Sequence, residues 1–249
     1  MRPDTDPRIR RLHLFRDMAQ AHFADLMTAS YVQLFPPGLE IIRQGDPADF
    51  LHIVLEGSVE LFGQWAEREC TMAVVQPVST FILAACIRDA PYLMGARTLE
   101  RTRLMLVPAS DVRAMFRRDG EFALAVIDEL AACYRSVVRS AKSMKLRNSR
   151  ERVASYLLRQ SLLAGGTPSY TLPVEKRLLA SYLGMTPENL SRTLKTLEAD
   201  GVKIDGARVI ITDRAKLTAL AKPDRLIDGP DAVATSAGIG LPLSREGSG

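Results

Sequence analysis

The sequence of 249 residues contains few of the residue types from which metal centres and disulfide frameworks are built. It has three cysteines and three histidines, and the cysteines, Cys70, Cys86 and Cys133, form no C-x-x-C pair. The spacing indicates neither a disulfide framework nor a zinc or iron–sulfur site, so buried free thiols are expected. No apolar run approaches the roughly 18 residues that a membrane-spanning helix needs, and we expect no membrane partner.

Two further absences narrow the function. The N-terminal residues are polar and include Asp4 and Asp6, where a secretory signal peptide has an apolar core, so a cytoplasmic protein is expected. The sequence has no G-x-S-x-G motif, no phosphate-binding loop and no histidines or carboxylates clustered at ligand spacing. We therefore expect no enzymatic activity. The net charge of +4 permits a polyanionic partner without requiring one.

The spacing of apolar residues divides the chain into segments. Residues 7–30 have the spacing of two short helices, whereas residues 32–108 contain short β-prone runs separated by turn residues. Turns about every 8 to 12 residues predict an antiparallel sandwich or barrel. The clearest strand pair is 50–55 with 58–62, and the alternation within the second strand predicts that one of its faces is exposed.

A long helix is predicted after the β-rich segment, because residues 121–146 contain neither glycine nor proline. Apolar residues recur in it at steps of three and four, at Val126, Leu130, Cys133, Val137, Ala141 and Met144. Such a seam packs either on the chain's own sandwich or against the same helix of a second copy, and spacing alone does not separate the two. The DNA-binding signal described next favours the dimer.

Residues 174–198 carry a helix-turn-helix signal. A first helix ends at Leu183, Gly184 supplies a left-handed turn residue, Thr186 is a good N-cap, and Pro187 suits the first position of a second helix. Leucines at helical spacing form the buried faces of both helices. The outer face of the second helix carries Glu188, Asn189, Ser191, Arg192 and Lys195.

These outer residues have the chemistry of a DNA major-groove contact. Arg192 can donate two hydrogen bonds to guanine, Glu188 can accept one from the cytosine amino group, and Ser191 can bind a base or a phosphate. Asp-Gly at 205–206 between two β-prone runs predicts a hairpin, and hence a winged helix-turn-helix. A solvated helix face could carry the same residues, but residues 148–222 also hold the charge excess, +5 against +1 for residues 1–147.

Over residues 10–220 the chain resembles the cyclic-AMP receptor protein and fumarate–nitrate reduction regulator (CRP/FNR) family. Gly45-Asp46, Ile53 and the run Glu56-Gly57-Ser58-Val59 occupy positions that are similar to those of the family. The resemblance implies an α+β fold with an N-terminal β jelly-roll effector domain of cyclic-nucleotide-binding type, a long dimerisation helix and a C-terminal winged helix-turn-helix. These parts correspond to residues 1–118, 119–147 and 148–222. Eleven of the residues 223–249 are Gly, Pro or Ser and no period is apparent there, so a flexible tail is expected.

The pattern Glu188-x-x-Ser191-Arg192 resembles the fumarate–nitrate regulator branch, whose members recognise an inverted repeat of TTGAT type. The resemblance implies that these three residues contact bases. It also implies partners: double-stranded DNA, RNA polymerase, a second copy of the chain and a small-molecule effector. The other residues predicted to bind DNA are Thr186, Asn189, Lys176, Lys195 and Arg208, the last three of them at phosphates.

The effector domain departs from its cyclic-nucleotide-binding relatives. Their phosphate cassette contains Phe-Ile-Gly-Glu-Leu and then Arg-Ser-Ala, whereas this chain has Phe-Ile-Leu-Ala-Ala at 81–85, and Tyr92 and Leu93 at the Arg and Ser positions. A buried phosphate needs compensating donors, and Arg88 and Arg97 are the nearby candidates. We do not expect cyclic-nucleotide binding. An apolar effector among Leu83, Cys86, Tyr92 and Leu93, or no small ligand, fits as well.

Other members of the family bind an iron–sulfur cluster or haem, and the sequence bears on both cofactors. Iron–sulfur members have several N-terminal cysteines, but this chain has none before Cys70, so no cluster is expected. Haem-binding members use histidine ligands, for which His13, His22 and His52 are the candidates, although an isolated histidine is more often a surface or core residue. The alternative function is a cyclic-nucleotide or haem sensor whose helical domain does not recognise a DNA sequence.

Overall fold

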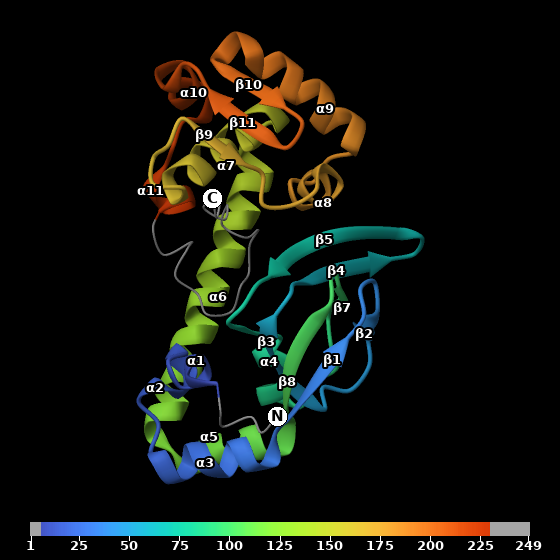
Figure 1. Cartoon of the computed structure of the whole chain (residues 1–249), viewed down its shortest axis with the longest axis vertical. Helices are drawn as coiled ribbons and strands as arrows, with labels where there is room; N and C mark the ends of the chain where they lie inside the picture. Colours follow the sequence, from blue (N-terminus) through green and yellow to red (C-terminus); the bar gives the residue numbers. More distant parts are fainter. Residues whose placement is uncertain (1–5, 230–249) are drawn as a thin grey trace. The chain divides into compact units, whose positions relative to one another are not determined.

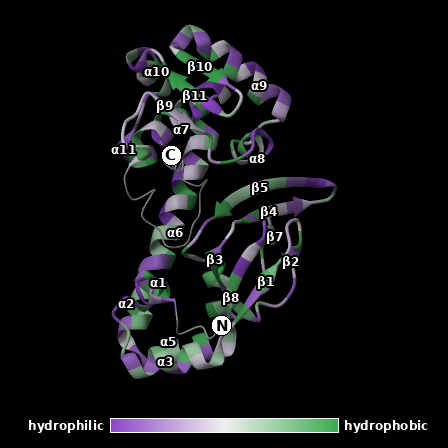
Figure 2. Cartoon of the chain, viewed as in Figure 1, coloured by the Kyte–Doolittle hydropathy of each residue, from purple (hydrophilic) through white to green (hydrophobic). Residues whose placement is uncertain are grey.

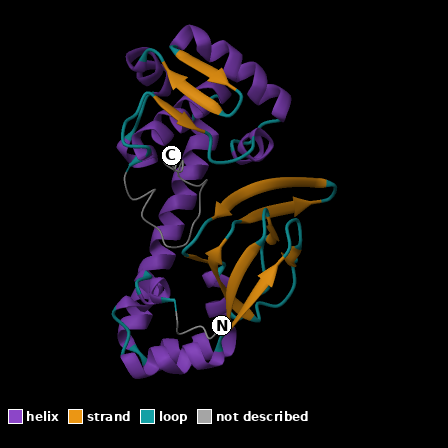
Figure 3. Cartoon of the chain, in the orientation of Figure 1, coloured by secondary structure: helices purple, strands orange, loops and turns teal. Residues whose placement is uncertain are grey.

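The computed structural model describes residues 6–229 (Figure 1). They form two compact units, the first ending at Tyr134 and the second beginning at Arg135, within one long helix. Antiparallel sheets and helices occur in both units (Figure 3), which confirms the α+β prediction. Within residues 6–229 no helix is both long and apolar enough to cross a bilayer.

The first unit contains five short helices, eight strands and the start of the long helix among the described residues. In chain order they are α1 (Pro7–Arg10), α2 (His13–Arg16), α3 (Gln20–Ala29), β1 (Tyr31–Phe35), β2 (Glu40–Ile42), β3 (Phe50–Glu56), β4 (Val59–Trp65), β5 (Arg68–Val75), β6 (Ser79–Phe81), α4 (Leu83–Arg88), β7 (Gly95–Thr98), β8 (Thr102–Pro108), α5 (Ala109–Arg118) and α6 (Gly120–Leu146). The N-terminal segment thus forms three helices where the spacing predicted two.

The eight strands form a sandwich of two antiparallel sheets, with strand orders β1-β8-β3-β6 and β2-β7-β4-β5. One apolar core lies between the sheets, with Ile42, Val54, Leu61 and Leu104 among its members. This arrangement confirms the predicted antiparallel sandwich. Its short strands and tight turns follow from the Gly and Pro punctuation of residues 32–108.

A second core covers the outer face of the sheet that contains β3. Leu51, Ile53 and Leu55 of β3 pack there with apolar residues of the flanking helices, including Phe122 and Val126 of α6. Strand β3 is consequently buried on both faces, which explains why its sequence is a continuous apolar run.

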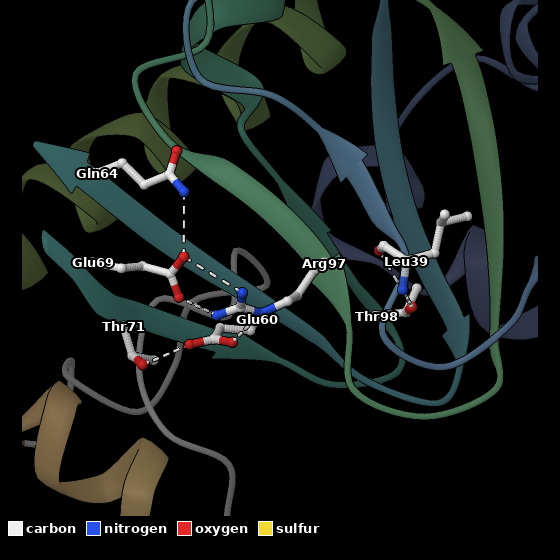
Figure 4. Close-up of polar contacts among 7 residues, drawn as sticks. All are labelled: Leu39, Glu60, Gln64, Glu69, Thr71, Arg97 and Thr98. Carbon is white, nitrogen blue, oxygen red and sulfur yellow. Dashed lines mark hydrogen bonds and ion pairs between the residues drawn. The ribbon is translucent and has the colours of Figure 1, made fainter. Parts of the chain in front are cut away.

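The outer face of β4 differs from the prediction. Glu60 and Phe62, on the face expected to be exposed, are 1% exposed. The carboxylate of Glu60 accepts hydrogen bonds from Arg97 Nε at 2.8 Å and Thr71 Oγ1 at 2.6 Å, and Arg97 also pairs with Glu69 (Figure 4). The Arg97 guanidinium lies over the Phe62 ring at 4.5 Å. These contacts satisfy the buried carboxylate, so alternation alone could not reveal that the face is covered.

Helix α6 shows the largest correction, because two residues of the predicted dimer seam belong to the chain's own core. Val126 is fully buried, and Leu130 packs against the same cluster. The exposed apolar residues of α6 in the first unit lie on another face: Leu124 (58% exposed), Ile127 (53%), Tyr134 (71%) and, between them, Ala131. We call these four residues the α6 stripe. Figure 2 shows hydrophobic and hydrophilic residues interspersed along α6.

The remaining seam residues have different surroundings. Cys133 is half-buried, and Val137 and Ala141 are exposed. Met144 lies close to Gly184 of the helix-turn-helix, where a Cβ would come within 2.2 Å of the methionine Cε. The predicted seam does not form one continuous dimer face, because α6 carries apolar residues on two adjacent faces and part of the seam lies on the face that packs into the chain's own core. Spacing could not show that the chain's own core uses one of them.

The second unit continues with a helical domain and a small sheet. Its elements are α7 (Ser149–Leu163), β9 (Ser169–Thr171), α8 (Lys176–Tyr182), α9 (Pro187–Thr196), the 3-10 helix η2 (Leu197–Asp200), β10 (Val202–Asp205), β11 (Arg208–Ile211), α10 (Arg214–Ala221) and α11 (Arg225–Asp228). Asn148 caps α7 in a capping box with Glu151.

The predicted tail starts too early. Residues 225–228 form α11, which is held by hydrogen bonds from Arg147 to Asp228. Gly, Pro and Ser composition concealed this helix because a charged pair fixes it rather than an apolar face. Residues 230–249 of the predicted tail lie outside the described residues.

Candidate nucleic-acid interface

Helices α8 and α9 are joined by a tight turn whose geometry follows from the sequence. Gly184 has φ +65°, in the left-handed region that a side chain rarely adopts. Its N–H donates to the carbonyl of Ser181, and the N–H of Met185 donates to that of Ala180. These bonds end α8 in the way that a left-handed glycine cap does.

The second helix begins at the predicted residue. Thr186 accepts a hydrogen bond from the N–H of Asn189 at 3.2 Å, and Pro187 occupies the first helical position. Leu190, Thr193 and Leu194 are buried on the inner face of α9. Because that face is fixed against the rest of the unit, the opposite face is directed to solvent.

The outer face of α9 holds the residues predicted to contact bases. Glu188, Asn189, Ser191, Arg192 and Lys195 are all exposed. Hydrogen bonds from its own backbone N–H and from the Thr186 hydroxyl lower the pKa of Glu188, with a further contribution from the Arg192 charge. Glu188 is consequently an ionised acceptor at neutral pH. Within residues 6–229, the Arg192 guanidinium makes no hydrogen bond or ion pair, so its donors are available.

The predicted hairpin is present beside this helix. Strands β10 and β11 are antiparallel: Val202 lies opposite Ile211 at one end of the pair, and Asp205 lies opposite Arg208 beside the turn. Gly206 in the turn has φ +57°. The sequence analysis missed the third strand, β9, which pairs with β11. Its three residues are too short for a period, so no pattern marked it.

The remaining predicted DNA-binding residues are exposed in the same unit. Thr186 lies in the turn, as the N-cap of α9, whereas Lys176 is the first residue of α8, at the end of that helix away from the turn. Arg208 begins β11 next to the hairpin turn, and its Nε donates to Ser169 Oγ at 2.8 Å. That bond ties the side chain of Arg208 to the adjacent strand β9.

Two family models match separate parts of the chain. The Crp-like helix-turn-helix domain matches residues 151–220, and the cyclic nucleotide-binding domain matches residues 32–119. The nitrogen fixation regulation protein FixK of Azorhizobium caulinodans is 30% identical over 198 residues, which cover 75% of this chain and 77% of FixK. The chain belongs to the CRP/FNR family.

Other CRP/FNR regulators resemble the chain over a similar length. The transcriptional activator protein FnrL of Cereibacter sphaeroides is 25% identical over 229 residues, covering 81% of this chain and 84% of FnrL. The structure of FixK2 from Bradyrhizobium japonicum has a TM-score of 0.67 at 22% identity, covering 78% of this chain and 98% of FixK2. This likeness supports the fold. The chain is therefore a DNA-binding transcription regulator of the CRP/FNR type with an effector-binding domain.

The predicted effector pocket of this CRP/FNR chain is not assembled as proposed. Leu83 and Cys86 share one face of α4 and pack into the core beneath the flanking helices. Tyr92 lies in the other core, between the sheets, where its hydroxyl donates to the Phe50 carbonyl. Leu93 is 84% exposed. The prediction was wrong because adjacent residues 92 and 93 point to opposite sides and α4 buries its residues in a different core.

Neither arginine considered as a phosphate ligand is placed to bind one within the sandwich. Arg97 is committed to Glu60 and Glu69, and two carboxylates beside a guanidinium repel an anion. Arg88 is exposed at the end of α4.

The three histidines lie in different environments. His22 Nδ1 is 2.8 Å from Asp119, a carboxylate that also accepts hydrogen bonds from the N–H groups of Ala19 and Phe122. His13 is half-exposed beside carboxylates of α6 at 3.7 and 3.9 Å. Among residues 6–229, no cluster of three or more His, Cys, Asp or Glu side chains could hold a metal ion.

His52 is buried inside the sandwich. Its ring stacks on Phe81 at 5.1 Å and meets Phe50 and Tyr92 edge-on at 6.4 Å. The Nδ1 atom is buried and has no hydrogen-bond partner in the described part of the chain. Burial lowers the pKa of His52 from 6.5 to about 4. The folded protein thus keeps this ring neutral.

We expect His52 to make the stability of the protein depend on pH. Between pH 6.5 and about 4 the unfolded chain protonates His52 and the folded chain does not, so acidification through this window favours unfolding. At about 1.4 kcal/mol per pKa unit, the loss over the whole window is roughly 3 kcal/mol. Urea unfolding of the wild type and of His52→Phe at pH 7.5 and 4.5 measures it. An equal acid-induced loss in both proteins would show that His52 does not contribute.

Proposed function

We propose that this regulator binds an inverted repeat of TTGAT type in duplex DNA as a homodimer, with α9 of each copy in the major groove. The observation that carries the proposal is the exposed outer face of α9, where ionised Glu188 and Arg192, whose guanidinium has no partner among residues 6–229, lie one helical turn apart near the helix N-terminus. Residues near the N-terminus of a recognition helix contact base edges in this type of domain.

Each predicted contact uses the chemistry of its side chain. Arg192 donates two hydrogen bonds to O6 and N7 of guanine, Glu188 accepts one from a cytosine amino group, and Ser191 bonds to a base or phosphate. Asn189 and Thr186 contribute at the start of the helix. Lys176, Lys195 and Arg208 bind phosphates, which fixes the register without distinguishing sequences.

The dimer is proposed to form through the α6 stripe rather than through the original seam. The residues of the α6 stripe follow one another at steps of three, four and three residues. The same spacing continues along the helix to Val138 and Ala141. Alternating steps of three and four are typical of helices that pair in a coiled coil. Three large apolar side chains that are more than half exposed along one helix are unfavourable in water, so a second copy of α6 is the occupant that the spacing favours.

The proposal includes RNA polymerase as a partner, as the resemblance implied, and an effector whose chemistry is unidentified. The cyclic nucleotide-binding model over residues 32–119 supports an effector-binding role for the sandwich. Tyr92 fills the position where the cassette arginine of cyclic-nucleotide-binding relatives is expected, which favours a ligand other than a cyclic nucleotide.

Selection from a library of random duplexes tests the proposed function. We expect enrichment of an inverted repeat with TTGAT-like half-sites whose centres are about one helical turn, 10 to 10.5 base pairs, apart. Enrichment of a single asymmetric motif would contradict the two-fold arrangement. Absence of any enriched sequence would favour a sensor whose helical domain does not distinguish sequences.

A further inference from the structure

Arg147 lies at the junction between the last residue of α6, Leu146, and the N-cap of α7, Asn148. Its side chain is 8% exposed, and its guanidinium donates to both carboxylate oxygens of Asp228, from Nη1 at 2.8 Å and Nη2 at 2.5 Å. Ser155 of α7 completes the contact by donating to Asp228 at 2.8 Å. A two-pronged pair of this kind fixes orientation as well as distance.

Asp228 is itself held in place by the local chain. Its second oxygen accepts a hydrogen bond from the N–H of Asp224 at 2.9 Å, and Arg147 Nη2 also donates to the carbonyl of Lys222 at 3.2 Å. The segment that follows α10 therefore returns to the α6–α7 junction and bonds to it through both side chain and backbone. No apolar face of α11 explains this return, because none of its four residues is buried.

A second arginine ties the same junction to the helix-turn-helix. Arg152 donates from Nη1 to the carbonyl of Arg147 at 2.8 Å and from Nε to the carbonyl of Leu183 at 3.1 Å. Leu183 immediately precedes Gly184, the glycine next to Met144 of α6. The C-terminal end of α6 and the turn before the recognition helix are thus linked through the junction that Asp228 holds.

We propose that Arg147 and Asp228 are positioning residues for DNA binding, which fix the angle between the end of α6 and the recognition helix and thereby set the half-site spacing that a dimer accepts. This inference rests on the proposed function. If α6 joins the two copies, the orientation of each recognition helix relative to α6 determines where both can enter successive major grooves. Neither residue contacts DNA, and α11 acts as a clamp on the junction.

The preference of the dimer for one half-site spacing distinguishes a positioning role of Arg147 and Asp228 from a role in folding stability alone. Inserting or deleting one base pair rotates one half-site about the duplex axis, and a rigid dimer can follow only by deforming the DNA. If the junction is loosened, the recognition helix can instead turn relative to α6 to reach the rotated half-site. Loss of stability alone lowers the active fraction equally for every spacing and leaves the ratio of affinities unchanged.

The experiment measures the affinities of the full-length protein for its selected operator and for operators one base pair longer and shorter. We expect the wild type to lose about tenfold in affinity at the altered spacings and Asp228→Ala to lose less than about threefold. Arg147→Ala should behave like Asp228→Ala, which provides a second variant if one of them folds poorly. Asp200→Ala, which removes the surface pair with Arg150 in the same unit, is the control and should keep the wild-type ratio.

The outcomes are distinguishable. An Asp228→Ala protein with the wild-type spacing ratio overturns the positioning role while leaving the proposed function intact. A wild type that prefers no inverted repeat at any spacing overturns the proposed function, and the positioning role with it. A flattened ratio in Asp228→Ala and Arg147→Ala, together with a wild-type ratio in Asp200→Ala, supports the inference.

Discussion

Arg192→Ala is expected to lose the preference for the selected operator while keeping nonspecific DNA binding. A bidentate arginine–guanine contact contributes about 1–3 kcal/mol of discrimination, and a two-fold site contains two of them, so we expect a loss of about 2–6 kcal/mol in specificity. Nonspecific affinity comes mainly from phosphate contacts, which this substitution does not remove. Competition binding against operator and random-sequence duplexes at one salt concentration measures both quantities.

Lys195→Ala provides the matched control on the same exposed helix face. A lysine at a phosphate contributes affinity for every sequence, so its loss should weaken operator and random duplex alike and lower the salt dependence by about one ion per copy. If Arg192→Ala also weakened both duplexes equally, the guanidinium would be a phosphate ligand and the predicted base contact would be wrong.

Ile127→Glu is expected to convert the dimer to monomers. The side chain is 53% exposed in the single chain, so the glutamate can be accommodated in the isolated fold. In the proposed dimer it would be buried against a second helix, where an uncompensated charge costs about 3–5 kcal/mol. Light scattering after size exclusion should then give the mass of one chain, 27.4 kDa, in place of twice that value.

Two other substitutions separate this interface from a general effect of charge. Leu162→Glu introduces the same change at an exposed leucine of α7, 59% exposed and outside α6, and should leave the dimer intact. Leu130→Glu, on the original seam, should lower the free energy of unfolding because Leu130 packs against the chain's own core. If Leu130→Glu dissociated the dimer and Ile127→Glu left it intact, the dimer would form through the predicted seam and not through the α6 stripe.

The helix-turn-helix could be predicted closely because its signals are local. Gly184 is needed for a positive φ, Thr186 for a cap and Pro187 for a first helical position, and each requirement is met within a few residues of the chain. The exposure of Arg192 follows from the same helical period. These features depend little on distant parts of the sequence.

The faces of α6 and β4 could not be predicted in the same way, because what covers them comes from far along the chain. Val126 is buried in a cluster that includes residues of the N-terminal helices and β3, and Glu60 is satisfied by Arg97, 37 residues away. A charged residue on a strand predicts an exposed face unless its partner is known. Close attention to the steps from Leu124 to Tyr134 could have revealed the α6 stripe, since its spacing fits a heptad as well as the seam does.

The effector domain was the least predictable part. Tyr92 and Leu93 are adjacent in sequence, yet one lies between the sheets and the other in solvent. Whether Tyr92 and Leu93 form a pocket with Leu83 and Cys86 could not be predicted without knowing that residues 83–88 form a helix and which core that helix faces. The α11 clamp was also missed, because a pair between Arg147 and Asp228 spans 81 residues and leaves no periodic signal.

Methylation interference on the selected operator tests most directly whether α9 recognises bases. Methylation of guanine N7 blocks one of the two acceptors that Arg192 is proposed to use in the major groove. We predict that methylating one guanine in each half-site abolishes binding of the wild type and that the same methylation no longer affects the residual binding of Arg192→Ala. Interference that is identical in the two proteins, or that occurs in one half-site alone, would contradict the account.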